Sequence, residues 1–173
     1  MQLVFCQCDL RGGRQGSIII MPTDDAQTVV QKEVAFMHCL FGLLAPAAFD
    51  IANHFAECAG FAWDYFTLPA RSQRRDFIEQ YLRKRKELSG DDGPEQDEDV
   101  EKLMAEVDSY RGLPGFFWGV WALLNAPFVL QEVYDFTIDA RLRLQEYWDW
   151  RKVDVDREPL LISKRESRWA QEE

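Results

Sequence analysis

Positive charge is scarce in this 173-residue sequence: 20 lysines and arginines stand against 30 aspartates and glutamates, for a formal net charge of −10 at pH 7. Nucleic acids and anionic lipid surfaces attract proteins that carry an excess of positive charge. The composition therefore excludes nucleic acid and anionic lipid as general partners of this chain.

A long uninterrupted apolar run is also missing. Residues 113–130 carry no charge and reach the lower limit of about 18 residues for a membrane span. Pro114 and Pro127 bracket this run, and Gly119 and Asn125 interrupt it. Only the part between the prolines can be regular helix, so we expect a core helix and no membrane span.

Cysteine and histidine are few, with four and two residues. The cysteines show no disulfide-framework spacing and no signal peptide is visible, which predicts a reducing, cytoplasmic setting. A zinc site that gathers distant thiols and imidazoles is an alternative, although the spacing matches no common zinc pattern. Its candidates are Cys6, Cys8, His38, Cys39, His54 and Cys58.

Apolar residues make up 47% of the sequence and aromatic residues 13%, enough for one domain with a real core. Apolar runs rich in branched residues predict strands, and apolar residues at helical spacing predict helices. The order of elements indicates an α+β fold with a small β-sheet and a larger helical bundle. Strands are expected at 3–6, 17–21 and 34–41, and helices at 47–57, after an N-cap at Ser72, from Val100, at 115–126 and after Pro127.

Charge divides the rest of the chain. Residues 89–99 are rich in acidic residues, glycine and proline, which predicts a mobile acidic loop. From Arg151 onward charges dominate, so we expect a domain over 1–150 and a loosely held charged tail over 151–173.

The segment 47–57 contains four polar side chains that could bind a ligand or a metal ion or transfer a proton. It reads AAFDIANHFAE, and its helical spacing places Asn53 with Glu57 on one face and Asp50 with His54 on another. Such groups can line a binding site. They can equally serve neighbouring backbone groups inside a packed fold.

Several segments together resemble the choline/ethanolamine kinase family, most of all its fungal ethanolamine kinases. FDIANHFAE is similar to the segment that follows the family's active-site strand, and LVFC resembles the strand that leads into its catalytic loop. The matches continue through RSQRRDFI, RGLPGFFWGVWAL and LRLQEYW, in the family's order and up to about Arg151. The resemblance implies the C-lobe of a protein kinase-like, aminoglycoside phosphotransferase-like fold, with the N-lobe absent.

The resemblance also implies a reaction, the transfer of the γ-phosphoryl group of ATP to ethanolamine or choline with Mg²⁺ as cofactor. This is an early step of phosphatidylethanolamine biosynthesis. Asp9 matches the catalytic base, and Ser17 (or Arg14) and His38 stand at the two metal positions. A small ammonium ligand is expected between the carboxylate of Glu57 and the rings of Trp118 and Trp121. Core packing is the alternative role of the two tryptophans.

The sequence departs from the family where the phosphate chemistry lies. Gln7 and Cys8 replace the catalytic-loop His and Asn, and imidazole at His38 is a poor ligand for Mg²⁺. No Gly-rich loop followed by a phosphate-binding lysine is found. The family's cage tyrosine on the closing helix falls on Asp139, which replaces a ring with a negative charge.

Two hypotheses follow. The chain is an ethanolamine kinase-like protein, truncated and impaired in phosphoryl transfer, with ATP and Mg²⁺ use in doubt. Alternatively, it is a non-catalytic relative that binds the amine or pairs with an intact kinase to regulate it.

Overall fold

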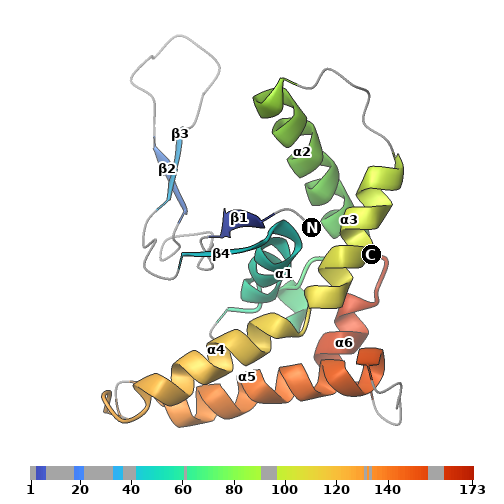
Figure 1. Cartoon of the computed structure of the whole chain (residues 1–173). Coiled ribbons are helices and arrows are strands. Elements are labelled where there is room, and N and C mark those ends of the chain that lie inside the picture. The colour runs from blue at the N-terminus through green and yellow to red at the C-terminus, as the bar shows by residue number, and fades with distance from the viewer. Residues whose placement is uncertain are drawn as a thin grey trace.

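The computed structural model describes the backbone of residues 3–6, 18–21 and 33–36, and residues 42–60, 62–90, 97–130, 132, 134–155 and 162–173. The fold is mostly helical (Figure 1). No helix in the described ranges is long and apolar enough to cross a bilayer.

The strands form two separate antiparallel pairs, where the sequence predicted one small sheet. β1 (Leu3–Cys6) pairs with β4 (Leu43–Pro46), and β2 (Ile18–Met21) pairs with β3 (Glu33–Phe36). The predicted strands at 3–6 and 17–21 are confirmed. The strand predicted at 34–41 is found only up to Phe36, since residues 37–41 lie outside the described ranges.

β4 was not predicted because LLAP is too short to show a period of two. It matters for the site, since it leads directly into α1 (Ala47–Glu57). The bounds of α1 agree with the predicted helix. Pro46 precedes the helix and Asp50 lies in its first turn, where a negative charge suits the helix dipole.

α1 is buried around most of its circumference, because it contacts both α3 and α4. Its polar residues Asn53 and Glu57 are buried together with its apolar ones. The helix is therefore a central element whose polar groups face protein.

α2 (Arg71–Ser89) begins two residues earlier than predicted. The backbone N–H of Ala70 donates to Oε1 of Gln73 at 2.9 Å, so Ser72 lies inside the first turn and is not the N-cap. The helix ends at Gly90, whose φ of 69° lies in the left-handed region that glycine adopts without strain.

α3 (Asp97–Tyr110) shortens the predicted acidic loop. Asp97, Glu98 and Asp99 form its first turn, where the helix dipole favours acidic side chains. The predicted apolar stripe is confirmed, and it packs in the main core with residues of α1 and α2. This core comprises Ile51, Phe55, Ile78, Leu82, Val100, Leu103, Met104 and Val107.

α4 (Leu113–Asn125) and α5 (Phe136–Trp150) lie side by side and run in opposite directions (Figure 1). The core helix predicted in this region is buried on one side only: Trp118 and Ala122 are buried, whereas Phe116 and Leu124 are exposed. α5 begins at Phe136, where the carboxylate of Asp135 accepts hydrogen bonds from two backbone N–H groups at 3.0 Å.

The prediction of a loosely held tail is wrong for residues 162–173. α6 (Lys164–Trp169) places Trp169 in the main core at 4% exposure. The indole N–H of Trp169 donates to Asp108 at 2.8 Å, and the backbone N–H of Arg71 donates to the carbonyl of Gln171 at 2.8 Å. The charges of this segment are used in specific contacts, which composition does not reveal.

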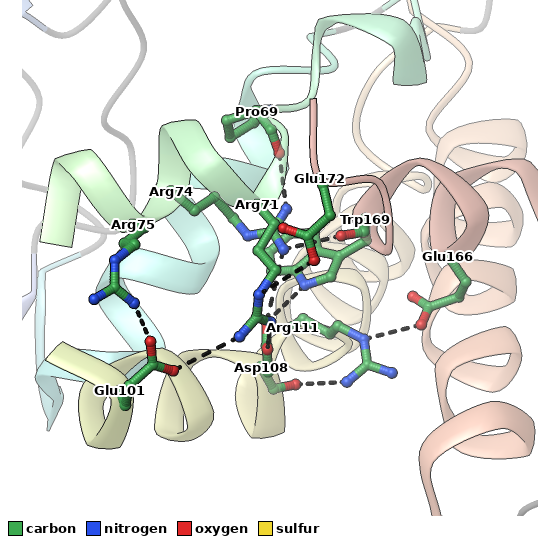
Figure 2. Close-up of polar contacts among 10 residues, drawn as sticks. All are labelled: Pro69, Arg71, Arg74, Arg75, Glu101, Asp108, Arg111, Glu166, Trp169 and Glu172. Carbon is green, nitrogen blue, oxygen red and sulfur yellow. Dashed lines mark hydrogen bonds and ion pairs between the residues drawn. The ribbon is translucent and has the colours of Figure 1, made fainter. Parts of the chain in front are cut away.

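Arg74 ties three helices together. Figure 2 shows its guanidinium between Pro69, Trp169 and Asp108, with Arg71 beside it. It donates to the carbonyls of Pro69 at 2.8 Å and Trp169 at 2.9 Å, and it lies 4.3 Å from the centre of the Trp169 ring. Burial lowers the pKa of Arg74 to about 10, in spite of nearby Asp108. The C-terminal segment is thus fixed by buried polar contacts.

Candidate functional site

The predicted site residues fall into two groups. Asp9, Ser17 and His38, expected at the base and metal positions, lie outside the described ranges together with Arg14. Glu57, Trp118 and Trp121, expected at the ammonium site, are described. Their roles can therefore be examined against geometry.

Glu57 is the last residue of α1 and is 4% exposed. Its Oε1 lies 3.5 Å from Nη2 of Arg143 on α5. An isolated carboxylate is costly to bury, and a cation at this distance offsets that cost. The end of α1 is thereby held against α5 by opposite charges.

Arg143 is the centre of the site. Its guanidinium lies 3.9 Å from Asp139 and 3.6 Å from Glu146, one turn before and after it on α5, in addition to Glu57. It also lies 4.4 Å from the centre of the Trp63 ring. Burial by itself would lower the pKa of Arg143, but the carboxylates of Glu146, Glu57 and Asp139 outweigh burial and raise it.

The ionic contacts continue to α6. Glu146 lies 3.8 Å from Arg165, which lies 2.8 Å from Glu166, and Glu166 accepts a hydrogen bond from Nε of Arg111 at 2.9 Å. The hydroxyl of Tyr65 donates to Glu146 at 2.9 Å. Burial, followed by the charge of Glu146, raises the pKa of Tyr65, so this phenol stays a donor at neutral pH.

We call this set the buried charge chain. Its members are four carboxylates and three guanidinium groups from α1, α5, α6 and the turn before α4. The members are Glu57, Arg111, Asp139, Arg143, Glu146, Arg165 and Glu166.

Aromatic rings lie next to the same turn of α1. The indole N–H of Trp118 donates at 2.9 Å to Asn53, one turn before Glu57. The rings of Trp118 and Trp121 are 5.6 Å apart with an interplanar angle of 84°, and Phe136 stands at 72° to Trp121, 5.3 Å away. Rings at right angles form the walls of cages that recognise ammonium groups.

The two tryptophans are not equivalent. Trp118 is 4% exposed and bonded to Asn53, so it also packs the fold, as the alternative reading of the sequence allowed. Trp121 is only partly buried and presents more of its ring to a ligand. A change at Trp121 is therefore the cleaner test of ligand binding.

Sequence reasoning missed Trp63, Tyr65 and Arg143. The spacing of Asp139, Arg143 and Glu146 indicates neighbouring charges on one helix face, which was a usable signal. Nothing local indicated that Trp63 and Tyr65, in the loop after α1, contact α5 residues eighty positions later. Asp139 directs its charge at Arg143, so its negative charge is already used within the protein.

The described residues contain no group of three or more histidine, cysteine, aspartate or glutamate side chains placed to hold a metal ion. The predicted metal positions and most zinc candidates lie outside those residues, so both remain predictions.

Cys58 provides a chemical reporter of the charge on Glu57. Burial, followed by the Glu57 carboxylate, raises the pKa of the Cys58 thiol. Only the thiolate reacts. We therefore expect Cys58 to be alkylated more slowly than an ordinary cysteine at pH 8. Its alkylation rate should keep rising at pH values where an ordinary cysteine has already reached its maximal rate. Glu57→Gln should speed alkylation at pH 8, because it removes the smaller of the two causes that raise the pKa of the thiol.

The measurement is alkylation by iodoacetamide, followed for the Cys58 peptide by mass spectrometry. Glu98→Gln, an exposed change on α3, is the control. Equal rates in wild type and Glu57→Gln would show that Glu57 does not act on this thiol.

The chain is similar to known proteins over most of its length. A family model described as choline/ethanolamine kinase matches residues 1–148. The probable choline kinase 3 of Arabidopsis thaliana is 31% identical over 154 residues, which cover 85% of this chain and 40% of that protein. The probable ethanolamine kinase of Nematostella vectensis is 40% identical over 106 residues, which cover 60% of this chain and 30% of the relative.

A solved ethanolamine kinase from Plasmodium vivax has a similar structure, with a TM-score of 0.66 and 27% identity, over 84% of this chain and 33% of its own. The kinase-like α+β fold predicted from the sequence is thereby confirmed, and the helices correspond to its C-lobe. The chain belongs to the choline/ethanolamine kinase family. It spans 40% or less of the length of these relatives.

Proposed function

We propose that this chain binds the ammonium group of ethanolamine or choline at the end of α1, between Glu57 and the rings of Trp118 and Trp121. The observation that carries the proposal is the contact between Trp118 and Asn53, one helical turn before the buried carboxylate of Glu57. The ring of Trp121 lies perpendicular to that of Trp118. A carboxylate combined with aromatic faces suits a small organic cation.

Arg143 and the ligand can contact the carboxylate of Glu57 at the same time. A carboxylate has about four acceptor positions on its two oxygens, so Glu57 can contact an ammonium group while it keeps Arg143. Asp139 and Glu146 hold the guanidinium from its other sides. The role of Arg143 in this proposal is to orient Glu57 toward the ligand.

We further propose that phosphoryl transfer is weak in this chain. In the family reaction Asp9 accepts the proton of the substrate hydroxyl, and Mg²⁺ neutralises the oxygens of the ATP phosphates. His38 and Ser17 offer an imidazole and a neutral hydroxyl, a donor set that does not fit Mg²⁺. Gln7 and Cys8 also replace the family's residues beside Asp9. A cytoplasmic location, suggested by cysteine spacing without a disulfide framework, belongs to the same proposal.

The second candidate function is a non-catalytic relative that binds the amine, or that pairs with an intact kinase and regulates it. The retained ammonium-site residues Glu57, Trp118 and Trp121, together with the altered metal positions, favour this candidate over an ordinary kinase. Both candidates share the ammonium site and differ in their use of ATP.

Calorimetric titration tests the proposal. We expect saturable binding of ethanolamine or choline, with affinity lowered by about five- to thirtyfold in Trp121→Leu, since a cation–π contact contributes about 1–2 kcal/mol. Glu57→Gln should abolish detectable binding, and Glu98→Gln should leave it unchanged. Absence of amine binding to the folded wild type would refute the ammonium site.

ATP with Mg²⁺ separates the candidates. Amine binding without ATP binding supports the non-catalytic relative, whereas phosphorylation of ethanolamine at a normal kinase rate would contradict the proposal of weak transfer.

A further inference from the structure

A cavity of about 420 Å³ opens between α6 and the 3₁₀ turn η2 (Tyr65–Thr67). Its volume lies within the range of about 300–1,000 Å³ that is usual for small-molecule sites. None of the three predicted ammonium-site residues lines it. The lining residues are Trp63, Asp64, Tyr65, Phe66, Ile162, Lys164, Ser167, Arg168 and Gln171. More than half of these lie beyond residue 148, outside the part of the chain that the family model matches.

Two aromatic walls of the cavity are held in place by the buried charge chain. The Trp63 ring lies 4.4 Å from the guanidinium carbon of Arg143, and the Tyr65 hydroxyl donates to Glu146 at 2.9 Å. The backbone of Trp63 has a φ of 57°, which costs a bulky residue about 1–3 kcal/mol and persists only where the surroundings impose it. These walls are therefore preorganised.

The turn between the walls is also fixed. The carboxylate of Asp64 accepts a hydrogen bond from the backbone N–H of Phe66 at 3.1 Å, and the hydroxyl of Thr67 donates to the carbonyl of Cys58 at 2.7 Å. Phe66 itself is 85% exposed. An apolar ring left in water at the rim of a cavity gains burial when a ligand covers it.

The charges around the cavity favour an anion. Lys164 and Arg168 outnumber Asp64, although the whole chain has a net charge of −10. Arg168 already donates to the carbonyl of Leu68 at 3.1 Å and to Gln171 at 2.7 Å. Lys164 forms no salt bridge with the described residues, and its ammonium group is the cation placed to meet a ligand.

We propose that this cavity binds a small organic anion with a flat apolar body, such as an aryl carboxylate, sulfonate or phosphate ester. The anionic group contacts Lys164, and the body lies against Trp63 and Phe66. The cavity is lined by other residues than the proposed ammonium site, and its test requires neither ethanolamine nor ATP.

The probe is 8-anilinonaphthalene-1-sulfonate, whose fluorescence rises in an apolar site. Its neutral counterpart, N-phenyl-1-naphthylamine, has the same rings without the charge. We expect one saturable sulfonate site and weaker binding of the neutral compound. Lys164→Gln should weaken sulfonate binding by at least about fivefold through loss of a charge-assisted contact, and Phe66→Ala should weaken both probes.

Matched variants separate this cavity from the exposed apolar residues of α4. Lys84→Gln changes an exposed lysine on α2, which does not line the cavity, and should leave sulfonate binding unchanged. Lys164→Arg keeps the positive charge and should bind the sulfonate about as tightly as wild type. The inference is overturned if Lys164→Gln and Lys84→Gln bind the sulfonate equally. It is also overturned if the neutral probe binds as tightly as the sulfonate.

Discussion

Arg143→Met is expected to lower the free energy of unfolding by about 3–5 kcal/mol, which is the usual cost of removing one partner from a buried ion pair. Methionine has a side chain of similar size but lacks the charge, the N–H donors and the guanidinium that lies over the Trp63 ring. Three carboxylates within 3.9 Å of the guanidinium would then share a buried site without their cation. Their mutual repulsion and desolvation produce the loss.

Urea denaturation measures this effect, and Arg141→Met is the matched control. Arg141 lies two residues earlier on the same helix and is exposed, so its change should fall within about 0.5 kcal/mol of wild type. In the double variant Glu57→Gln/Arg143→Met, part of the loss should be recovered, because one of the orphaned charges is gone. Equal stability of the Arg143 and Arg141 variants would show that the charge chain does not hold α5 in place.

Gly115→Ala should also destabilise the fold, by about 1–3 kcal/mol or more. In an ordinary helix this change stabilises by about 1 kcal/mol, since glycine is a poor helix former. Here a Cβ atom at position 115 would lie 2.6 Å from the backbone carbonyl oxygen of Arg143. That oxygen belongs to α5 and cannot move without the helix, so α4 and α5 would be forced apart.

Gly119→Ala, one turn further along α4, supplies the comparison. Its new Cβ would meet Cγ of Leu144 at 2.8 Å, and a side chain can shift more easily than a backbone. The loss should therefore be smaller than at Gly115. Thermal unfolding of both variants measures the difference, and a Gly115 variant as stable as wild type would contradict the close approach of the two helices.

Both predictions concern the same interface, with consequences for the candidate site. α5 carries Asp139, Arg143 and Glu146, whereas α4 carries Trp118 and Trp121. In the proposed ammonium site, the distance between these helices sets the separation of the carboxylates from the rings. A loss of amine affinity in Gly115→Ala at temperatures where it remains folded would follow directly from this geometry.

Local patterns were enough to find the elements that build the site. The spacing of Val100, Leu103, Met104 and Val107 predicted the buried face of α3, and the segment 47–57 predicted α1 with the correct bounds. Helical periodicity is a local property, and therefore readable without a structure. Element boundaries that depend on capping contacts were less well predicted, as Ser72 illustrates.

Partners far apart in the sequence could not be predicted in this way. Arg165 lies in a segment that composition indicated to be a charged tail, yet it is 2% exposed and contacts Glu146. A charged residue is usually at the surface, and it becomes buried only where an opposite charge meets it. The contact between Arg165 and Glu146 depends on how α6 packs against α5, and this packing cannot be predicted from a local sequence pattern.

The sequence by itself therefore determined the kinase-like family resemblance, the main helices and Glu57, Trp118 and Trp121 as candidates for an ammonium site, because these follow from motifs and periodicity along the chain. Only the tertiary structure decided that Arg143 holds Glu57, that α6 completes the buried charge chain and that Trp63 and Tyr65 line a cavity beside α6. The physical reason is that burial and charge compensation arise between residues brought together by packing, at separations over which the sequence carries no periodic signal.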